Sequence, residues 1–283
     1  GDVYKRQDQG TRERALQELA KLHGKTREEE MVAVFERLES MGGAFNDAAG
    51  ELGKLVASTP GPKLAASRAG FLALAQKATL PQVRRCVWGA LILGDGDPGQ
   101  TWKQASTEAA RNALLDAIGF VADPGLRAKF QPILQELLAD AKLPAGTRAA
   151  LVRALPLTGP AHAKANFAAL AGFLARGEER SGAARSIMQL GRENWDKAAA
   201  APAVESLLAW ARSVPASKRT EQSFVETVQA AGELAGLLEN EPRLAVRKEL
   251  RGLGVSVFVV KTVREQMRYD TPCIVVDAGK PFE

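Results

Sequence analysis

Residues 84–93 read Arg84-Arg85-Cys86-Val87-Trp88-Gly89-Ala90-Leu91-Ile92-Leu93, and they hold the pattern that decides the fold. Arg84 is followed at recurring helical spacings by apolar residues, which places these residues on one face of an α-helix. The pattern is Arg84, Val87, Ala90, Leu91, Leu93, and it returns as Arg111, Leu114, Ala117, Ile118, Phe120, as Arg148, Leu151, Ala154, Leu155, Leu157, and more weakly as Ser181, Ala184, Ile187, Met188, Leu190. A lone helix pair cannot bury such a face, so the pattern predicts helices that stack on their neighbours.

Prolines and glycines divide the chain into segments of helical length. The predicted helices span residues 11–22, 26–40, 46–57, 62–78, 81–93, 101–121, 125–141, 145–155, 161–175, 179–191, 197–212, 219–239 and 242–252. Taken in pairs, they begin near residues 11, 45, 81, 124, 160 and 196, and this spacing of about 34–43 residues lies in the period range of helical repeats. We therefore predict an all-α fold of antiparallel helix pairs over residues 8–253.

Local signals indicate where several helices begin or bend. Thr26-Arg27-Glu28-Glu29 has the form of a capping box, in which the threonine oxygen and the last glutamate each accept a hydrogen bond from an otherwise unpaired amide. Because the missing amide of a proline costs nothing in the first helical turn, four prolines are expected near helix starts: Pro62, Pro81, Pro202 and Pro242. Pro132 lies inside a helical pattern and is expected to kink or split it.

The composition favours helix and excludes two classes of partner. The chain is 46% hydrophobic and 25% charged, and no apolar run approaches the roughly 18–20 residues that span a bilayer. The formal net charge is +5, but basic and acidic residues are interspersed, without the basic block or stripe of a nucleic-acid-binding protein. We therefore expect no membrane span and no nucleic-acid partner.

The standard catalytic and metal-binding motifs are not found in the sequence. Gly24-Lys25-Thr26 lacks the upstream glycine of a phosphate-binding loop. The segment Asp95-Gly96-Asp97-Pro98-Gly99 lacks the acidic residue that closes a calcium loop, so an ordinary inter-helix turn is expected. His23 and His162 lie far apart, and each is expected near a helix end in a solvated or capping role. We predict no catalytic, cofactor-binding or metal-ligating residue in this chain.

The cysteines and tryptophans are expected to serve packing. Cys86 and Cys273 make neither a disulfide framework nor a CxxC pair. Cys86 lies on an apolar helix face, which predicts a small buried hydrophobe. Core packing is likewise expected of the four tryptophans, because a binding surface would require them on one exposed side: Trp88, Trp102, Trp195 and Trp210.

The chain changes character at both ends. Val255-Ser256-Val257-Phe258-Val259-Val260 and Ile274-Val275-Val276 are short and β-branched, which predicts two strands. The first residues, Gly1-Asp2-Val3-Tyr4-Lys5-Arg6-Gln7, can be encoded by GGA GAT GTG TAT AAG AGA CAG, which resembles a transposon end used in sequencing libraries. We therefore expect residues 1–7 to be a sequencing artefact outside the fold, and the chain to be a fragment of a longer protein.

The recurring motif and the spacing of the helix pairs resemble HEAT repeats over residues 8–253. This resemblance implies an α-solenoid, in which antiparallel helix pairs stack into an array. The motif is loose and its copies are unevenly spaced. An irregular helical bundle is therefore the structural alternative.

Residues 254–283 resemble the start of a plastocyanin/azurin-like (cupredoxin) domain of the kind found at the end of large multidomain proteins. The matching residues are Glu265, Gln266, Met267, Tyr269, Asp270, Ala278, Gly279, Lys280 and Pro281. The resemblance implies the opening strands of a truncated cupredoxin sandwich, with the copper ligands (two histidines, a cysteine and usually a methionine) beyond Glu283. Cys273 lies in an early strand and Met267 in the connecting segment, so neither is expected to bind copper.

These expectations combine into one functional prediction with an alternative. The residues present form a non-catalytic helical scaffold, and type 1 copper in the full-length protein serves electron transfer. The resemblance implies an extracytoplasmic, periplasmic location, a protein partner or adjacent redox domain, and room for an oxidoreductase domain in the parent protein. The alternative is a protein–protein adaptor that uses the solenoid surface and has no redox role. A solenoid enzyme has no supporting residues.

Overall fold

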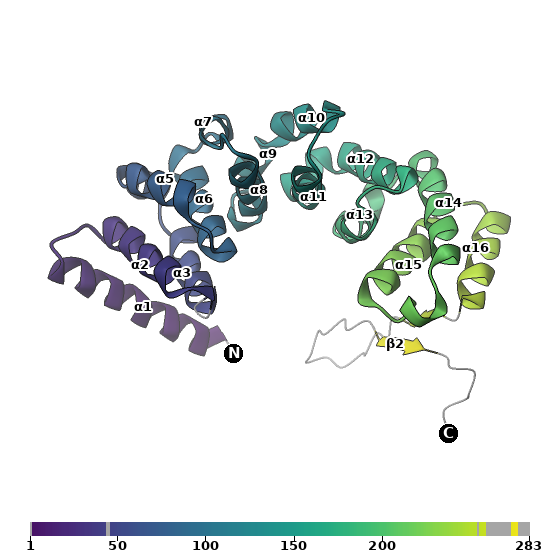
Figure 1. Ribbon diagram of the computed structural model, residues 1–283, viewed down its shortest axis with the longest axis horizontal. Coiled ribbons are helices and arrows are strands. Elements are labelled where there is room, and N and C mark those ends of the chain that lie inside the picture. Colours follow the sequence, from purple (N-terminus) through teal and green to yellow (C-terminus); the bar gives the residue numbers. More distant parts are fainter. Residues whose placement is uncertain (1, 44–45, 254, 259–272, 277–283) are drawn as a thin grey trace, which may run out of the picture. The chain divides into compact units, whose positions relative to one another are not determined.

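The computed structural model describes the backbone of residues 2–43, 46–253, 255–258 and 273–276, and the side chains of residues 10–43 and 47–253. Most of these residues are helical, so the predicted all-α class is confirmed. The chain forms two compact units, Gly1–Gly159 and Pro160–Glu283 (Figure 1). Among the described residues, no helix combines the length and the apolar character needed to cross a bilayer.

The first unit is a succession of helices that pack on partners close in sequence. They are α1 (Asp2–Leu22), α2 (Arg27–Met41), α3 (Asn46–Ala57), α4 (Gly61–Ala66), α5 (Arg68–Lys77), α6 (Pro81–Asp95), α7 (Pro98–Gln104), α8 (Glu108–Ala117), η2 (Ile118–Phe120), α9 (Pro124–Ala128), α10 (Gln131–Ala139), α11 (Ala145–Ala154) and η3 (Leu155–Thr158). Helices α3, α6, α8 and α11 contact one another in that order, and α4 and α5 pack against α6. In Figure 1 these four helices follow one side of the unit, while α2, α5, α7 and α10 follow the other.

The second unit continues in the same manner. It contains η4 (Pro160–His162), α12 (Ala163–Arg176), α13 (Arg180–Ile187), η5 (Arg192–Asn194), α14 (Lys197–Ser213), η6 (Ala216–Lys218), α15 (Gln222–Ala235) and α16 (Asn240–Gly252). Helix α12 contacts α13 and α14, α13 and α14 both contact α15, and α16 packs on α15. Each helix thus contacts its neighbour or the next helix but one.

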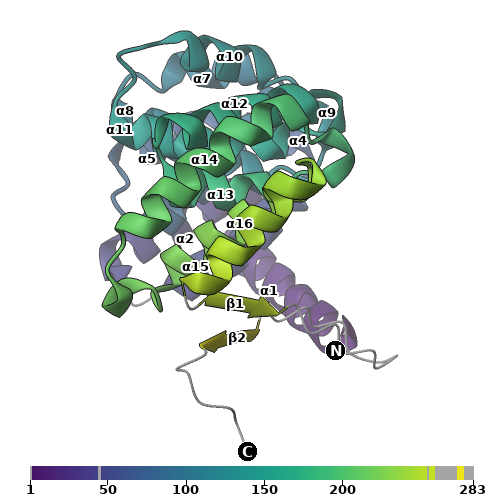
Figure 2. The same cartoon turned by 90° about the vertical axis from the view of Figure 1, so that its right-hand side faces the viewer.

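Two short strands follow α16. β1 (Val255–Phe258) and β2 (Cys273–Val276) pair in antiparallel register, with Val255 opposite Val276 and Phe258 opposite Cys273. β1 also contacts α15 and α16 (Figure 2). The motif residues at 265–270 and 278–281, Met267 among them, lie outside the described residues.

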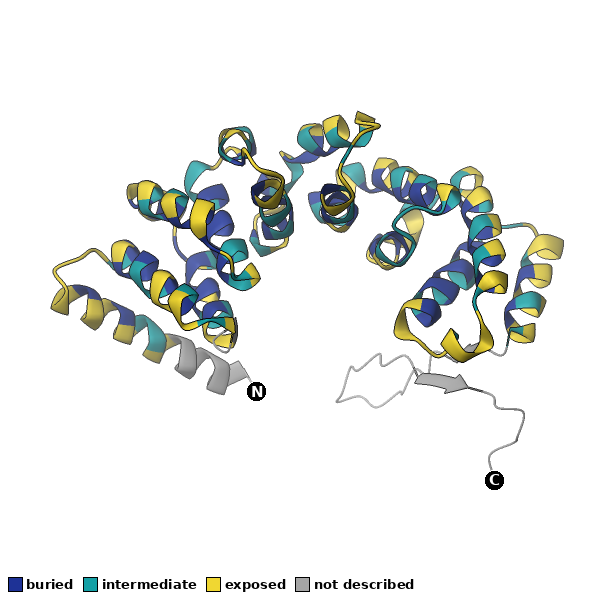
Figure 3. Cartoon of the chain, viewed as in Figure 1, coloured by how far each residue is buried: buried dark blue, intermediate teal, exposed yellow. Residues whose placement is uncertain are grey.

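The core of each unit is formed by the faces that the helices turn toward one another, which Figure 3 shows in dark blue. The first three copies of the recurring motif supply much of this core in the first unit. Their central apolar residues are all at most 2% exposed: Val87, Leu91, Leu114, Ile118, Leu151 and Leu155. The prediction that these positions are buried between helices is therefore confirmed.

The arginine of the recurring motif has a structural role of its own. The Nε of Arg111 donates a hydrogen bond of 3.1 Å to the carbonyl of Ala105, and Nη2 of Arg148 donates one of 3.3 Å to the carbonyl of Leu143. Both carbonyls lie just before the helix that carries the arginine. A carbonyl oxygen in an inter-helix loop has no hydrogen-bond donor within a helix. The arginine supplies that donor and so holds the loop against the start of its own helix.

Several of the predicted long helices are divided into shorter ones in the structure. The predicted helix 62–78 is divided into α4 and α5 at Ser67, and the predicted helix 101–121 is divided into α7, α8 and η2. Pro132 does split its helix, since α9 ends before it and α10 begins at Gln131. Of the four prolines expected near helix starts, Pro62, Pro81 and Pro242 do lie in first turns. Pro202 lies inside α14, because Asp196 already caps that helix by accepting from the amide of Ala199.

The first helix also differs from prediction. α1 begins at Asp2, whereas a start at residue 11 was expected and residues 1–7 were placed outside the fold. Neither proline nor glycine interrupts residues 2–9, so the helical propensity of this stretch extends the helix beyond the expected start. The side chains of residues 1–9 lie outside the described residues.

Two close approaches between helices depend on glycine. A Cβ built on Gly61 in α4 would lie 2.5 Å from the carbonyl oxygen of Leu93 in α6. A Cβ on Gly89 in α6 would lie 2.7 Å from Cδ1 of Phe120, and one on Gly53 in α3 would lie 3.0 Å from the same ring. Phe120 in η2 therefore lies across two earlier helices at positions where only glycine leaves room for its ring.

Candidate functional site

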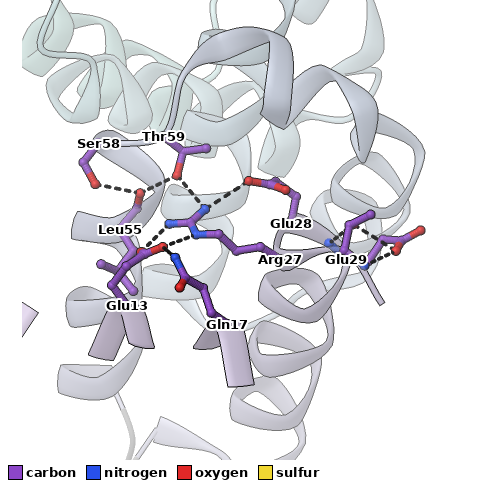
Figure 4. A network of polar contacts seen from close by, with 9 residues as sticks. Glu13, Gln17, Arg27, Glu28, Glu29, Leu55, Ser58 and Thr59 are labelled. Atoms are coloured by element: carbon purple, nitrogen blue, oxygen red, sulfur yellow. Dashed lines mark hydrogen bonds and ion pairs between the residues drawn. The ribbon is translucent and has the colours of Figure 1, made fainter. Parts of the chain in front are cut away.

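The densest polar network of the described residues is centred on Arg27, the first residue of α2 (Figure 4). Arg27 follows the capping residue Thr26, so the predicted capping box places it at the start of its helix. The box itself is confirmed: the amide of Glu29 donates to Thr26 Oγ1 at 3.2 Å, and the amide of Thr26 donates to Glu29 Oε2 at 2.7 Å. A well-defined helix start thus positions the arginine.

Arg27 connects three elements through one guanidinium. Its Nε and Nη2 each donate to a different carboxylate oxygen of Glu13 in α1, both at 2.6 Å. Its Nη1 donates to Glu28 at 3.1 Å and to the hydroxyl of Thr59, after α3, at 3.0 Å. The planar guanidinium matches a carboxylate at two points, a geometry that lysine does not offer.

The electrostatics of this network favour the charged forms. The hydrogen bonds from Arg27 are the main reason that the pKa of Glu13 is lowered from its ordinary value, and burial opposes them. The hydrogen bond to Glu13 in turn raises the pKa of Arg27. Glu13 and Arg27 therefore stay ionised as a pair, which suits a fixed connection between helices better than proton transfer.

A pocket of about 440 Å³ opens beside this network. Its polar lining comes from α1, α2, the α3–α4 turn and α4: Glu13, Gln17, Arg27, Ser58, Thr59 and Lys63. The hydroxyls of Ser58 and Thr59 donate to the carbonyl of Leu55, at 3.0 and 2.7 Å. Neither hydroxyl is hydrogen-bonded to a base, so the arrangement lacks an activated nucleophile. What the contacts of the network show is a connection between α1, α2 and the turn after α3.

A second polar cluster surrounds the buried carboxylate of Glu30 in α2. Glu30 is fully enclosed, and it accepts from Nδ1 of His23 at 2.9 Å and from Arg37 at 3.3 Å, with the Lys25 ammonium 3.8 Å away. Because a buried charge is costly without partners, the hydrogen bond from His23 and the cations of Arg37 and Lys25 are what permits the glutamate at this position. His23 thus belongs to a structural ion cluster in the turn between α1 and α2.

The other residues weighed from the sequence are placed separately. Cys86 is fully buried, so the prediction of a small buried hydrophobe is confirmed, and burial raises the pKa of its thiol to about 12. His162 lies half-exposed at the N-cap position of α12, where its side chain makes no cap hydrogen bond, so of the predicted solvated or capping role only the solvated one fits. In the segment at 95–99, Asp95 accepts from Arg68 and Thr101 while Asp97 caps α7, so the prediction of an inter-helix turn is confirmed.

The tryptophans divide into two groups. Trp88 is fully buried, as predicted, but Trp102, Trp195 and Trp210 are only partly buried. Each of these three has a guanidinium within 6 Å of its ring centre: Arg111 over Trp102, Arg192 over Trp195 and Arg180 over Trp210. The arginines cover the ring faces by cation–π contact, so these three tryptophans have contacts within the fold although they are only partly buried.

The described residues do not fit a type 1 copper site. Such a site requires one thiolate and two imidazoles close together. Within the described part of the chain, no group of three histidine, cysteine, aspartate or glutamate side chains could hold a metal ion. The thiol of Cys86 is enclosed in apolar packing, and the side chains of Cys273 and Met267 lie outside the described residues.

No protein-family model matches this chain, and no curated protein or solved structure matches it either. Function is therefore inferred from the residues and contacts of the chain itself.

The sequence reasoning missed the Arg27 network. It named Arg27 and Glu28 only as members of a capping box, and it did not connect them with Glu13 or Thr59. A signal exists, because residues of opposite charge lie on consecutive predicted helices. Charge alone could not select the pair, because the register of α1 against α2 depends on the turn at Gly24, where φ is +64°.

Proposed function

We propose that this chain is a non-catalytic helical-repeat scaffold, a HEAT-like α-solenoid in which successive helix pairs stack on one another. One observation carries the proposal. Polar contacts between helices repeatedly join positions about forty residues apart, which is one predicted repeat. An irregular bundle has no reason to repeat one separation.

In the first unit, four such contacts support this register. Arg12 pairs with Glu51 over 39 residues, Lys77 with Glu36 over 41 and Arg153 with Asp116 over 37. In addition, the Glu39 carboxylate accepts from the amide and the hydroxyl of Thr79, 40 residues later, both at 2.5 Å. The Glu39 carboxylate thereby holds the segment that leads into α6.

In the second unit, four ion pairs have the same spacing. Arg185 pairs with Glu226 and Arg192 with Glu233, both over 41 residues. Lys197 pairs with Glu239 over 42 residues, and Arg212 with Glu249 over 37. Exposed pairs of this kind contribute only about 0–1 kcal/mol each, so they mark the register of the repeats and do not account for their stability.

Small-angle X-ray scattering of the whole chain tests the solenoid. A compact chain of this length has a radius of gyration of about 19 Å, whereas a stacked array of helix pairs is extended and has a clearly larger value. A radius of gyration well above the compact value is the expected result. A value at the compact figure would favour the irregular bundle and overturn the solenoid.

The second candidate function is electron transfer by a copper domain that continues from residues 254–283. It is supported by the order of motif residues from Glu265 to Pro281 and by the antiparallel pairing of β1 with β2, which suits the opening of a β-sandwich. On this proposal the copper ligands follow Glu283, the protein is extracytoplasmic and periplasmic, and the helical array carries the copper domain beside a redox partner.

Copper titration tests this second candidate. Copper(II) is added to the chain of 283 residues and to the product of the parent open reading frame, and the visible spectrum of each is recorded. We expect an intense blue thiolate-to-copper band from the longer protein alone. A blue band from the shorter chain would refute the proposed position of the ligands. A colourless longer protein would exclude the copper function and leave the adaptor role.

A further inference from the structure

Arg85, in the recurring motif segment, has no acidic partner among the described residues. Arg85 in α6 is half-buried, and among the described residues no group accepts a hydrogen bond from it or forms an ion pair with it. Its Nε atom is enclosed and unpaired. The two Nη atoms at the end of the side chain are not enclosed, so a partner can supply acceptors to them.

The surroundings of Arg85 form a small surface patch, which we define as Arg85, Gly119, Phe120 and Leu157. A Cβ built on Gly119 would lie 3.5 Å from Cδ1 of Leu157 and 3.8 Å from Nη2 of Arg85, so the exposed glycine lies between the two side chains. Phe120 follows directly, with its ring seated on Gly89 and Gly53. Phe120 and Leu157 are both half-buried, so the patch presents apolar surface beside a cation.

Three features of the patch point to one kind of ligand. A guanidinium without a partner complements a carboxylate, which it can hold by two parallel hydrogen bonds. The flanking phenyl and leucyl side chains complement an apolar residue next to that carboxylate, and an arginine beside an aromatic ring is typical of the energetic centre of a protein interface. The missing side chain at Gly119 leaves the guanidinium accessible between them.

The same features disfavour other polyanions. Nucleic acids and anionic membranes are bound by several cations that neutralise several phosphates. In the described part of the chain, the patch offers one arginine, Arg85, beside the apolar side chains of Phe120 and Leu157.

We propose that the patch of Arg85, Gly119, Phe120 and Leu157 is a docking site for an acidic segment of a partner protein, with one carboxylate on Arg85 and an adjacent apolar side chain on Phe120 and Leu157. The proposal rests on the scaffold function and names the chemistry of the partner. The docking site itself depends only on the first unit, because α6, η2 and η3 carry all four residues of the patch.

The test uses a fluorescein-labelled peptide that alternates glutamate and leucine, and it measures fluorescence anisotropy against the whole chain. We expect saturable binding that weakens about tenfold or more in Arg85→Gln, which corresponds to roughly 1.4 kcal/mol. Gly119→Leu fills the space between Leu157 and Arg85, so it should also block the peptide while leaving the melting temperature unchanged. The matched control is Arg247→Gln, which removes one exposed and unpaired arginine from α16 and should leave binding intact.

Several outcomes would overturn the docking site. These are no saturable binding, equal binding by wild type and Arg85→Gln, equal weakening in Arg247→Gln, or equal binding of a peptide with glutamine in place of glutamate. Phosphatidylserine vesicles and duplex DNA are tested in parallel, and Arg85-dependent binding of either without the peptide would also refute a protein partner. Scattering on the same samples separates the two proposals, because an extended chain that fails to bind refutes only the docking site.

Discussion

The guanidinium of Arg27 holds the carboxylate of Glu13 at both oxygens, with Nε–Oε1 and Nη2–Oε2 distances of 2.6 Å. The two residues belong to consecutive helices, α2 and α1, so this pair fixes their register. Because the same guanidinium reaches Thr59, the contact also includes the turn after α3. One side chain thereby attaches α1 to α2 and to the turn after α3.

Replacing Arg27 by lysine should destabilise the protein by about 1–2 kcal/mol, because a lysine ammonium cannot match two carboxylate oxygens and Thr59 at once. Urea unfolding followed by circular dichroism measures the effect. The control is Arg14→Lys on the exposed side of α1, which should change the free energy of unfolding by less than about 0.5 kcal/mol. Equal changes in the free energy of unfolding for the two variants would show that the two-point contact of Arg27 with Glu13 does not stabilise the fold.

The stability that Glu13 contributes should depend on pH in one direction. Its pKa in the folded protein is below the ordinary value of 4.5, mainly because of the hydrogen bonds from Arg27. A carboxyl group with a lowered folded-state pKa stabilises the fold above its unfolded pKa, and this contribution is lost as the pH falls through the folded pKa.

The comparison of wild type with Glu13→Gln isolates this residue from the other titrating carboxyl groups. Wild type should be the more stable protein at pH 7, and the difference in free energy of unfolding should shrink as the pH falls below 4.5. Thermal unfolding at a series of pH values provides the measurement. A difference that grows on acidification would contradict the assigned direction of the pKa shift.

Gly61→Ala should destabilise the first unit by about 1–3 kcal/mol, because the new Cβ would lie 2.5 Å from a backbone oxygen of α6 that cannot rotate away. Gly252→Ala in α16 is the matched control, since a Cβ there meets nothing within 4 Å. That control should be neutral or stabilising by up to about 1 kcal/mol. Chemical denaturation of both variants measures the two free energies of unfolding. An unchanged stability of Gly61→Ala would mean that α4 and α6 are farther apart than described.

Leu151→Ala should cost on the order of 2–5 kcal/mol, because Leu151 is fully buried where α11 meets α8 and its removal leaves a cavity. Leu244→Ala, at a position that is 60% exposed on α16, should cost less than about 0.5 kcal/mol. Differential scanning calorimetry measures both. If the two variants melt together, Leu151 does not belong to the core.

The elements that local chemistry determines were predictable from the sequence. The Thr26–Glu29 capping box forms because its groups are three residues apart, and the central apolar residues of the motif, such as Leu91 and Leu151, are buried because their helical spacing places them on one face. The break at Ser67 was not predictable, because the apolar pattern continues across it. The Arg27–Glu13 ion pair and the close approach of the Phe120 ring to Gly89 join separate helices, so they depend on a three-dimensional register that no single-helix pattern contains.

The contacts spaced by about forty residues have a mechanical consequence. In the proposed solenoid each of them connects one repeat to the next, for example Arg153 to Asp116 or Arg212 to Glu249. A pulling force on the two ends of such an array would act on all these boundaries in series, and the weakest would open first. Such a molecule should lengthen in successive small steps and recoil when released, as a spring does, because each boundary can open and close while the others stay shut.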